Sequence, residues 1–204
     1  MSASEWTAAE DEKLANVHDV LIRRRDLALL EEGCWLNDQL VSLGLHDALH
    51  AIVADQALRQ TVAVLDCEVV QLLRFADPQT FRQVLASLAV TEKTLLLLPL
   101  NNNPSVSAPG GSHWSLVAYL RGVFYHFDSL DHCNETVAEQ LCDKLFPVVS
   151  EGRKNRRPRD ADGAVFVPVD CGRQSNASDC GVHVWHFAKL VLRTFARGVR
   201  SVVC

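Results

Sequence analysis

A continuous apolar run constrains the fold of this chain more than any other feature of its sequence. Residues 94–100 (Thr-Leu-Leu-Leu-Leu-Pro-Leu) carry no charge and are followed by three asparagines, a pattern that predicts a strand buried on both faces. Two further apolar segments, 114–120 and 123–128, flank Arg121-Gly122 and predict a hairpin. Residues 165–169 predict another short strand. The sheet is therefore expected in the second half of the chain.

Segments with helical periodicity stand on both sides of these strands. Their apolar residues recur at spacings of three and four after good capping residues, which is typical of helices that bury one face. Helices are expected over residues 37–52, 66–75, 77–88, 135–145 and 180–195. Helices first, strands in the middle and a closing helix predict an α+β fold class.

The length of 204 residues predicts a single domain, residues 1–204, that is large enough to bury a core. Its first segment, residues 1–16, is polar and acidic and is expected to be frayed. No apolar run approaches the roughly 18 residues that a membrane span requires, and no N-terminal stretch resembles a signal peptide. We therefore expect no membrane partner. We also expect the protein to be a monomer.

The formal net charge of -5 argues against a nucleic-acid partner and leaves proteins and small molecules open. Seven cysteines without an export signal indicate reduced thiols, so we expect a cytoplasmic or nuclear protein. The basic residues within 153–159 are similar to a nuclear signal, but the acidic residues on either side favour an exposed loop.

Five residues suit the hydrolysis of a peptide bond by a thiol. Helix N-termini lower the pKa of a thiol, and Cys180 stands at a predicted helix start. His113 begins a predicted strand and Asp128 ends the paired one, so they are expected to lie together as base and orienting carboxylate. Gln174 offers a side-chain amide and Gly181 an unobstructed backbone N–H to the oxyanion of the reaction.

Each of these residues also has an ordinary structural interpretation. A cysteine on a buried helix is usually a small core residue, and a histidine before tryptophan is more often structural. An aspartate before serine commonly forms a turn. Spacing alone therefore leaves the catalytic set as one hypothesis among several.

Three short sequences favour the catalytic hypothesis: Gly-Gly-Ser-His-Trp-Ser-Leu at 110–116, Phe-Asp-Ser at 127–129 and Gln-Ser-Asn-Ala-Ser-Asp-Cys-Gly at 174–181. Their residues and their order resemble the ubiquitin-like-protein-specific (sentrin/SUMO) cysteine proteases. His, Asp, Gln and Cys all match the family pattern. Trp-Leu-Asn-Asp at 35–38 also resembles the element that opens the family's first helix. The resemblance runs from about residue 21 to residue 195.

Within that family, the deneddylase branch (proteins like sentrin-specific protease 8) is most similar, because of the domain start near residue 1, the Asn-rich loop 101–112 and the pair Ser115-Leu116. The resemblance implies a papain-like fold with rearranged His-Asp-Cys order and no cofactor or metal. It implies a thiol isopeptidase and endopeptidase that cleaves after the C-terminal Gly-Gly of a ubiquitin-like modifier or its conjugates. The Rub/Nedd-type modifier is the expected partner.

The same resemblance implies a narrow channel for the tail of the modifier. Trp114 would cover it, and only glycine, which lacks a Cβ, allows a backbone to approach an indole so closely. Trp35 and Asp38 would line the channel together with Gly181, and Asp38 would pair with an arginine of the tail. Core packing for Trp35 and helix capping for Asp38 stay open as alternatives.

Four other functions remain as alternatives. A SUMO-specific protease would use the same residues. A zinc-binding module would draw on Cys171, Cys180, His183 and His186, although no cysteine pair has the usual C-x2-4-C spacing. An acyltransferase built on the same triad would not need the tunnel tryptophan. An inactive modifier-binding module would not need all four catalytic positions.

Overall fold

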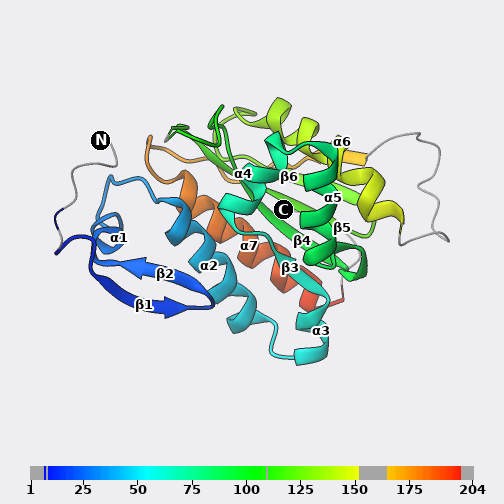
Figure 1. Cartoon of the computed structure of the whole chain (residues 1–204), viewed down its shortest axis with the longest axis horizontal. Helices are drawn as coiled ribbons and strands as arrows, with labels where there is room; N and C mark the ends of the chain where they lie inside the picture. The colour runs from blue at the N-terminus through cyan, green and yellow to red at the C-terminus, as the bar shows by residue number, and fades with distance from the viewer. Residues whose placement is uncertain (1–6, 8, 109, 152–164, 199–204) are drawn as a thin grey trace.

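A mixed five-stranded sheet, in the order β3-β4-β5-β6-β7, forms the centre of the computed structural model (Figure 1). The structure describes residues 7, 9–108, 110–151 and 165–198. β4, β5 and β6 are antiparallel neighbours, whereas β3 and β7 add to the two edges in parallel. The strands are Val62–Val64 (β3), Leu95–Asn101 (β4), Trp114–Leu120 (β5), Val123–Phe127 (β6) and Val165–Pro168 (β7).

Helices pack on both faces of this sheet (Figure 1). The longer ones are α2 (Asp38–Ile52), α4 (Cys67–Phe75), α5 (Pro78–Ser87), α6 (Glu135–Glu151) and α7 (Cys180–Ala196). Leu95 and Leu97 of β4 pack with α2 and α7, and Leu96 and Leu98 pack with α4, α5 and α6. Side chains alternate across a strand, so two covered faces explain the continuous apolar run and confirm the buried strand predicted from it.

An N-terminal hairpin includes residues 13–16, the last part of the segment that was expected to be frayed. β1 (Lys13–Val17) pairs antiparallel with β2 (Val20–Arg23), and Asp11 forms ion pairs with Arg23 at 2.9 Å and Arg25 at 2.6 Å. All five residues of β1 are exposed. The strand has no buried face, and therefore the sequence shows no apolar alternation that would reveal it.

The other predicted elements are present with small shifts. α6 continues through Pro147 to Glu151, past its expected end at residue 145. Two short helices, α1 (Arg24–Ala28) and α3 (Gln56–Gln60), a 3-10 turn over Val90–Glu92 (η1) and strand β3 were not predicted. The basic stretch 153–159 lies outside the described residues. Among the residues that are described, no helix combines the length and apolar character needed to span a bilayer.

Candidate active site

Cys180 is the first residue of α7, and the turn before it is fixed by one asparagine. Asn176 Oδ1 accepts hydrogen bonds from the backbone N–H groups of Ser178 and Asp179, both at 3.0 Å. The α7 helix then begins, with His183 N–H bonded to the Asp179 carbonyl at 2.9 Å. The thiol therefore stands at the N-terminus of a 17-residue helix, where the helix dipole favours negative charge.

His113 and Asp128 form a buried pair, as the hairpin predicted. His113 directly precedes β5, Asp128 directly follows β6, and the two strands pair antiparallel. His113 Nε2 lies 2.6 Å from Asp128 Oδ1, with side chains only 1% and 5% exposed. The other ring nitrogen, His113 Nδ1, is buried and has no hydrogen-bond partner of normal geometry among the described residues, so it remains for the thiol and its substrate.

The electrostatics of this pair favour a charged histidine. Burial by itself lowers the pKa of His113, but the hydrogen bond to Asp128, the neighbouring Cys180 and the negative charge of both side chains together raise it to about 9. Burial raises the pKa of Asp128, yet the His113 hydrogen bond and the backbone N–H groups of Asn134 and Leu130 hold it below its ordinary value. His113 therefore carries its proton at neutral pH, beside a thiol.

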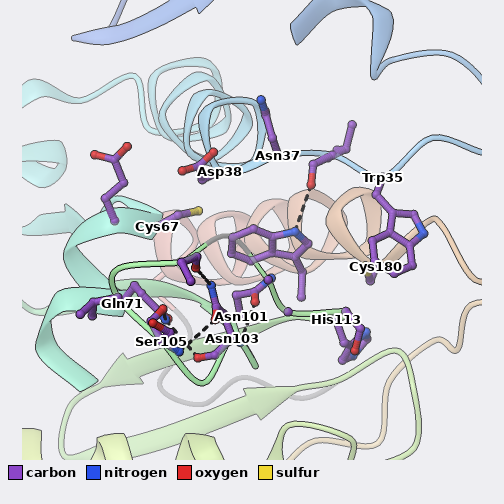
Figure 2. A pocket seen from close by; sticks show the side chains of 18 of the residues that line it. Trp35, Asn37, Asp38, Cys67, Gln71, Asn101, Asn103, Ser105, His113 and Cys180 are labelled. Carbon is purple, nitrogen blue, oxygen red and sulfur yellow. Dashed lines mark hydrogen bonds between the residues drawn. The ribbon is translucent and has the colours of Figure 1, made fainter. Parts of the chain in front are cut away.

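A groove of about 710 Å³ leads to these residues. Figure 2 shows His113 and Cys180 toward one end of it and Gln71 and Ser105 toward the other. Trp35 stands at the rim with 47% of its surface exposed, which argues against the alternative of core packing. Asp38, Glu68 and His113 are the titratable acids and bases that line the groove, apart from the thiols of Cys67 and Cys180. The part of the groove that lies away from His113 is therefore negatively charged.

Asp38 lines the groove and directly follows the N-cap residue of α2. Asn37 is the capping residue, since its Oδ1 accepts from the Leu40 N–H at 3.1 Å. Asn37 is held in turn by the buried Asp26, whose Oδ1 accepts from Asn37 Nδ2 at 2.7 Å. Asp38 Oδ1 accepts from the Gln39 N–H in the first turn of α2 at 3.2 Å, so the carboxylate supports the start of the helix and also lines the groove.

Trp114 and Gly181 meet at the segment before α2. The indole Nε1–H of Trp114 donates to the backbone carbonyl of Leu36 at 3.0 Å. A Cβ on Gly181 would lie 2.9 Å from Leu36 Cβ, closer than real Cβ contacts. Glycine at this position therefore lets the start of α7 pack against Leu36, while Leu36 holds the indole over the groove.

Gln174 lies close to the triad but is not among the residues that line the groove. Its Oε1 accepts from the Ser129 hydroxyl at 2.7 Å, and its Nε2 donates to the Asn176 carbonyl at 2.7 Å. Asn176 is the residue that shapes the turn before Cys180. One of the two N–H bonds of Nε2 is used in this way, which ties the carboxamide to the start of α7.

The Asn-rich loop that forms one wall of the groove is built by its own side chains and by α4. Asn101 Oδ1 accepts from the Asn103 N–H at 2.8 Å. From α4, Gln71 Nε2 donates to the carbonyls of Asn103 and Ser105, and Arg74 Nη1 donates to those of Asn101 and Asn103. Sequence reasoning missed Gln71 and Arg74, because a glutamine and an arginine three positions apart on a helix carry no motif.

The proposed zinc ligands are not brought together. Among the described residues, which include Cys171, Cys180, His183 and His186, no group of three or more His, Cys, Asp and Glu is placed to hold a metal ion. Cys171 Sγ instead lies 3.5 Å from the Asp128 backbone carbonyl. The ring of His183 packs at 5.6 Å from that of Phe187.

Comparison with known proteins agrees with this geometry. The model of the Ulp1 protease family, C-terminal catalytic domain, matches residues 34–201. NEDD8-specific protease 1 of Arabidopsis thaliana is 29% identical over 197 residues, covering 93% of this chain and 80% of that protein. Sentrin-specific protease 8 of Homo sapiens is 30% identical over 182 residues, covering 88% of this chain and 81% of that protein.

Solved structures show the same fold. The C-terminal Ulp1 protease domain in complex with Smt3, the yeast ortholog of SUMO, superposes with a TM-score of 0.70 at 19% identity, covering 97% of this chain and 85% of that one. The Xanthomonas campestris effector XopD bound to ubiquitin gives 0.59 at 20% identity, covering 83% of each chain. These neighbours confirm the predicted α+β protease fold. The chain therefore belongs to the Ulp1 protease family, and it is a cysteine protease.

Proposed function

We propose that this protease cleaves after the C-terminal Gly-Gly of a Rub/Nedd-type modifier, both in precursors and in isopeptide conjugates. The observation that carries the proposal is the indole of Trp114, bonded to Leu36 over the groove that ends at Cys180 and His113. A backbone that passes beneath an indole has room for glycine and not for a larger residue. The relatives named NEDD8-specific protease 1 and sentrin-specific protease 8 support the choice of modifier.

The first half of the proposed reaction forms a thioester. The Cys180 thiolate attacks the carbonyl carbon of the terminal glycine, and the carbonyl oxygen becomes an oxyanion. We assign this oxyanion to the backbone N–H groups at the start of α7 and to the second N–H of Gln174 Nε2. As the C–N bond breaks, His113 Nδ1 gives its proton to the leaving amine, and Asp128 holds the imidazole through Nε2.

The second half releases the modifier. A water molecule gives a proton to His113 while its oxygen attacks the thioester carbonyl. The C–S bond then breaks, which returns the Cys180 thiolate and leaves a C-terminal carboxylic acid on the modifier, and this acid loses its proton to solvent to give the carboxylate. Because the pKa of His113 is raised to about 9, the histidine returns to its protonated form at neutral pH.

We assign recognition of the modifier's tail to the part of the groove that lies away from the Cys180 thiol. Asp38 and Glu68 place two carboxylates there, which suits a basic side chain of the tail, and we assign an arginine to Asp38. Trp35 offers an exposed ring at the rim for the apolar part of the tail.

A monomer suffices for this function, since thiol, base and groove all belong to one chain. A cytoplasmic or nuclear location is proposed because the reaction needs Cys180 as a reduced thiol, which these compartments maintain. A SUMO-specific protease is the second candidate, and the fold shared with the Smt3-bound Ulp1 domain favours it. At 19% identity, however, that likeness concerns the fold alone.

The test compares three reporter fusions, in which the Rub/Nedd-type modifier, SUMO or ubiquitin precedes the same fluorogenic group. We expect the highest kcat/KM for the Rub/Nedd-type fusion and no turnover of any fusion by Cys180→Ala. A higher kcat/KM for SUMO would favour the second candidate. Absence of cleavage of all three by the wild-type protein would overturn the proposal.

A further inference from the structure

Asn134 is a fully buried polar residue that contacts both members of the His113–Asp128 pair. Its backbone N–H donates to Asp128 Oδ2 at 2.8 Å. Its Nδ2 lies 3.3 Å from the His113 backbone carbonyl, 3.3 Å from that of Leu100 and 3.1 Å from Ser115 Oγ. The side chain is 0% exposed. One residue therefore binds the carboxylate of the pair and the peptide group of its histidine.

This side chain does not do what an asparagine ordinarily does at its position. The Asn134 carbonyl accepts the Ala138 N–H at 2.9 Å, which makes Asn134 the residue that precedes the first turn of α6. There the side-chain oxygen of an asparagine usually accepts a backbone N–H of the helix. In the described structure Asn134 Oδ1 is buried without a hydrogen-bond partner, because the carboxamide is turned away from α6 toward the end of β4 and the start of β5.

We propose that Asn134 is a positioning residue that sets the geometry of His113 and Asp128. The inference rests on the proposed function, in which these two residues act as base and orienting group. The Asn134 N–H fixes Oδ2, so that Oδ1 of the same carboxylate points at His113 Nε2, 2.6 Å away. The Asn134 carboxamide holds the His113 peptide from the other side. The separation of imidazole and carboxylate is thus fixed at both ends.

A neutral histidine completes the network. Ser115 Oγ, which accepts from Asn134, also bonds to His126 Nε2 at 3.1 Å. Burial lowers the pKa of His126 to about 4, and the ring is therefore uncharged at neutral pH. His126 therefore does not act as a second cation beside Asp128, and Asn134 keeps a hydrogen-bonded rather than a charged neighbour.

The deciding variant is Asn134→Ser. Serine is about as good a helix cap as asparagine, so α6 is expected to keep its stability, but the hydroxyl is too short to reach the His113 carbonyl. With the reporter fusion that the wild-type protein cleaves, we expect kcat to fall about 10- to 100-fold with KM nearly unchanged, since a small misplacement of reacting groups has effects of this size. The pKa of His113, followed by NMR of its ring, should fall below about 9.

Two further variants separate positioning from stability. Asn134→Ala removes the buried carboxamide and, unlike serine, offers no hydroxyl that could cap α6, so it should lose both kcat and stability. Leu141→Ala, in the buried face of α6, should lose stability but keep kcat and the pKa of His113. Wild-type kcat together with an unshifted His113 pKa in Asn134→Ser would overturn the inference. The NMR titration tests it even if the wild-type protein cleaves no modifier, an outcome that would refute only the proposed function.

Discussion

The side chain of Trp114 and the backbone of Leu36, 78 positions apart, are joined by a hydrogen bond of 3.0 Å from the indole Nε1–H to the carbonyl oxygen. Leu36 also packs against Gly181 at the start of α7. The segment before α2 therefore connects the cover of the groove to the residue that follows the thiol. A substitution at this contact is expected to disturb both the Trp114 indole and the start of α7.

Gly181→Ala is expected to destabilise the protein and to slow cleavage. The added Cβ would lie 2.9 Å from Leu36 Cβ, and forced overpacking of this kind costs about 1–3 kcal/mol. Urea unfolding and kcat/KM measure the two effects. Gly172→Ala is the matched control, since a Cβ there meets nothing within 4 Å. Equal stability and activity of the two variants would mean that Leu36 yields without moving α7.

Gly111→Ala is expected to impair cleavage of the modifier while leaving the thiol reactive. Gly111 has a φ of +83°, and a Cβ would lie 1.8 Å from Asn101 Oδ1, so the loop wall of the groove must shift. We expect kcat/KM to fall about 10-fold or more, with alkylation of Cys180 by iodoacetamide nearly unchanged.

The control for this variant is Gly122→Ala in the β5–β6 turn. Gly122 has a φ of +99° and open space around its Cα, so it shares the backbone strain without the clash. If both variants lost cleavage equally, backbone strain rather than the loop wall would be the cause. If alkylation fell together with cleavage in Gly111→Ala, the thiol itself would have moved.

Cleavage should become slower at basic pH because His113 loses its proton there. Its pKa is raised to about 9, so the proton needed by the leaving amine is present at neutral pH and is lost as the pH rises through that value. A profile of kcat/KM against pH should fall near pH 9. Asp128→Asn removes the charge that raises this pKa, and we expect the fall to move to lower pH. If kcat/KM of Asp128→Asn fell at the same basic pH as that of the wild-type protein, Asp128 would not control the pKa of the titrating histidine.

His126 should make the folded state sensitive to acid. Its pKa is lowered from 6.5 to about 4. Between these two pH values, His126 is therefore protonated in the unfolded chain and neutral in the folded chain. Stability should therefore decrease as the pH falls from 6.5 to about 4, by at most about 3 kcal/mol.

Urea unfolding at several pH values measures this effect. His126→Gln, which keeps a hydrogen-bonding group for Ser115, should flatten the dependence, whereas His186→Gln at an exposed position should not. Asp128 also makes the protein less stable as the pH falls, but at lower pH values than His126. Its lowered pKa contributes stability that is lost only as the pH falls below the ordinary aspartate value. An equal slope for His126→Gln and the wild-type protein would contradict the assignment.

Most of the framework was predictable because it follows from short-range patterns. The run 94–100 required a strand covered on both faces, and the hairpin around Arg121-Gly122 brought His113 beside Asp128. The helix start at Cys180 was equally visible from its local residues. In each case neighbouring positions of the sequence carry the information.

The remaining features depend on contacts between distant positions made by common residue types. Asn134 looked like an ordinary residue before a helix, and only the structure shows its carboxamide facing His113 and Ser115. Arg74, which holds the loop, is 27 positions from Asn101. The β1 strand has no buried face to give it a period. None of these leaves a pattern in the local sequence.

The most direct test of the account uses a Rub/Nedd-type modifier whose C-terminal glycine carries a thiol-reactive electrophile. Intact mass and peptide mapping should show one adduct, on Cys180, formed faster than with the matching SUMO and ubiquitin probes. Cys180→Ala should form no adduct, and His113→Ala should form it more slowly. An adduct on another cysteine, or equal labelling of the wild-type and Cys180→Ala proteins, would contradict the central claim that Cys180 is the nucleophile of a modifier-specific protease.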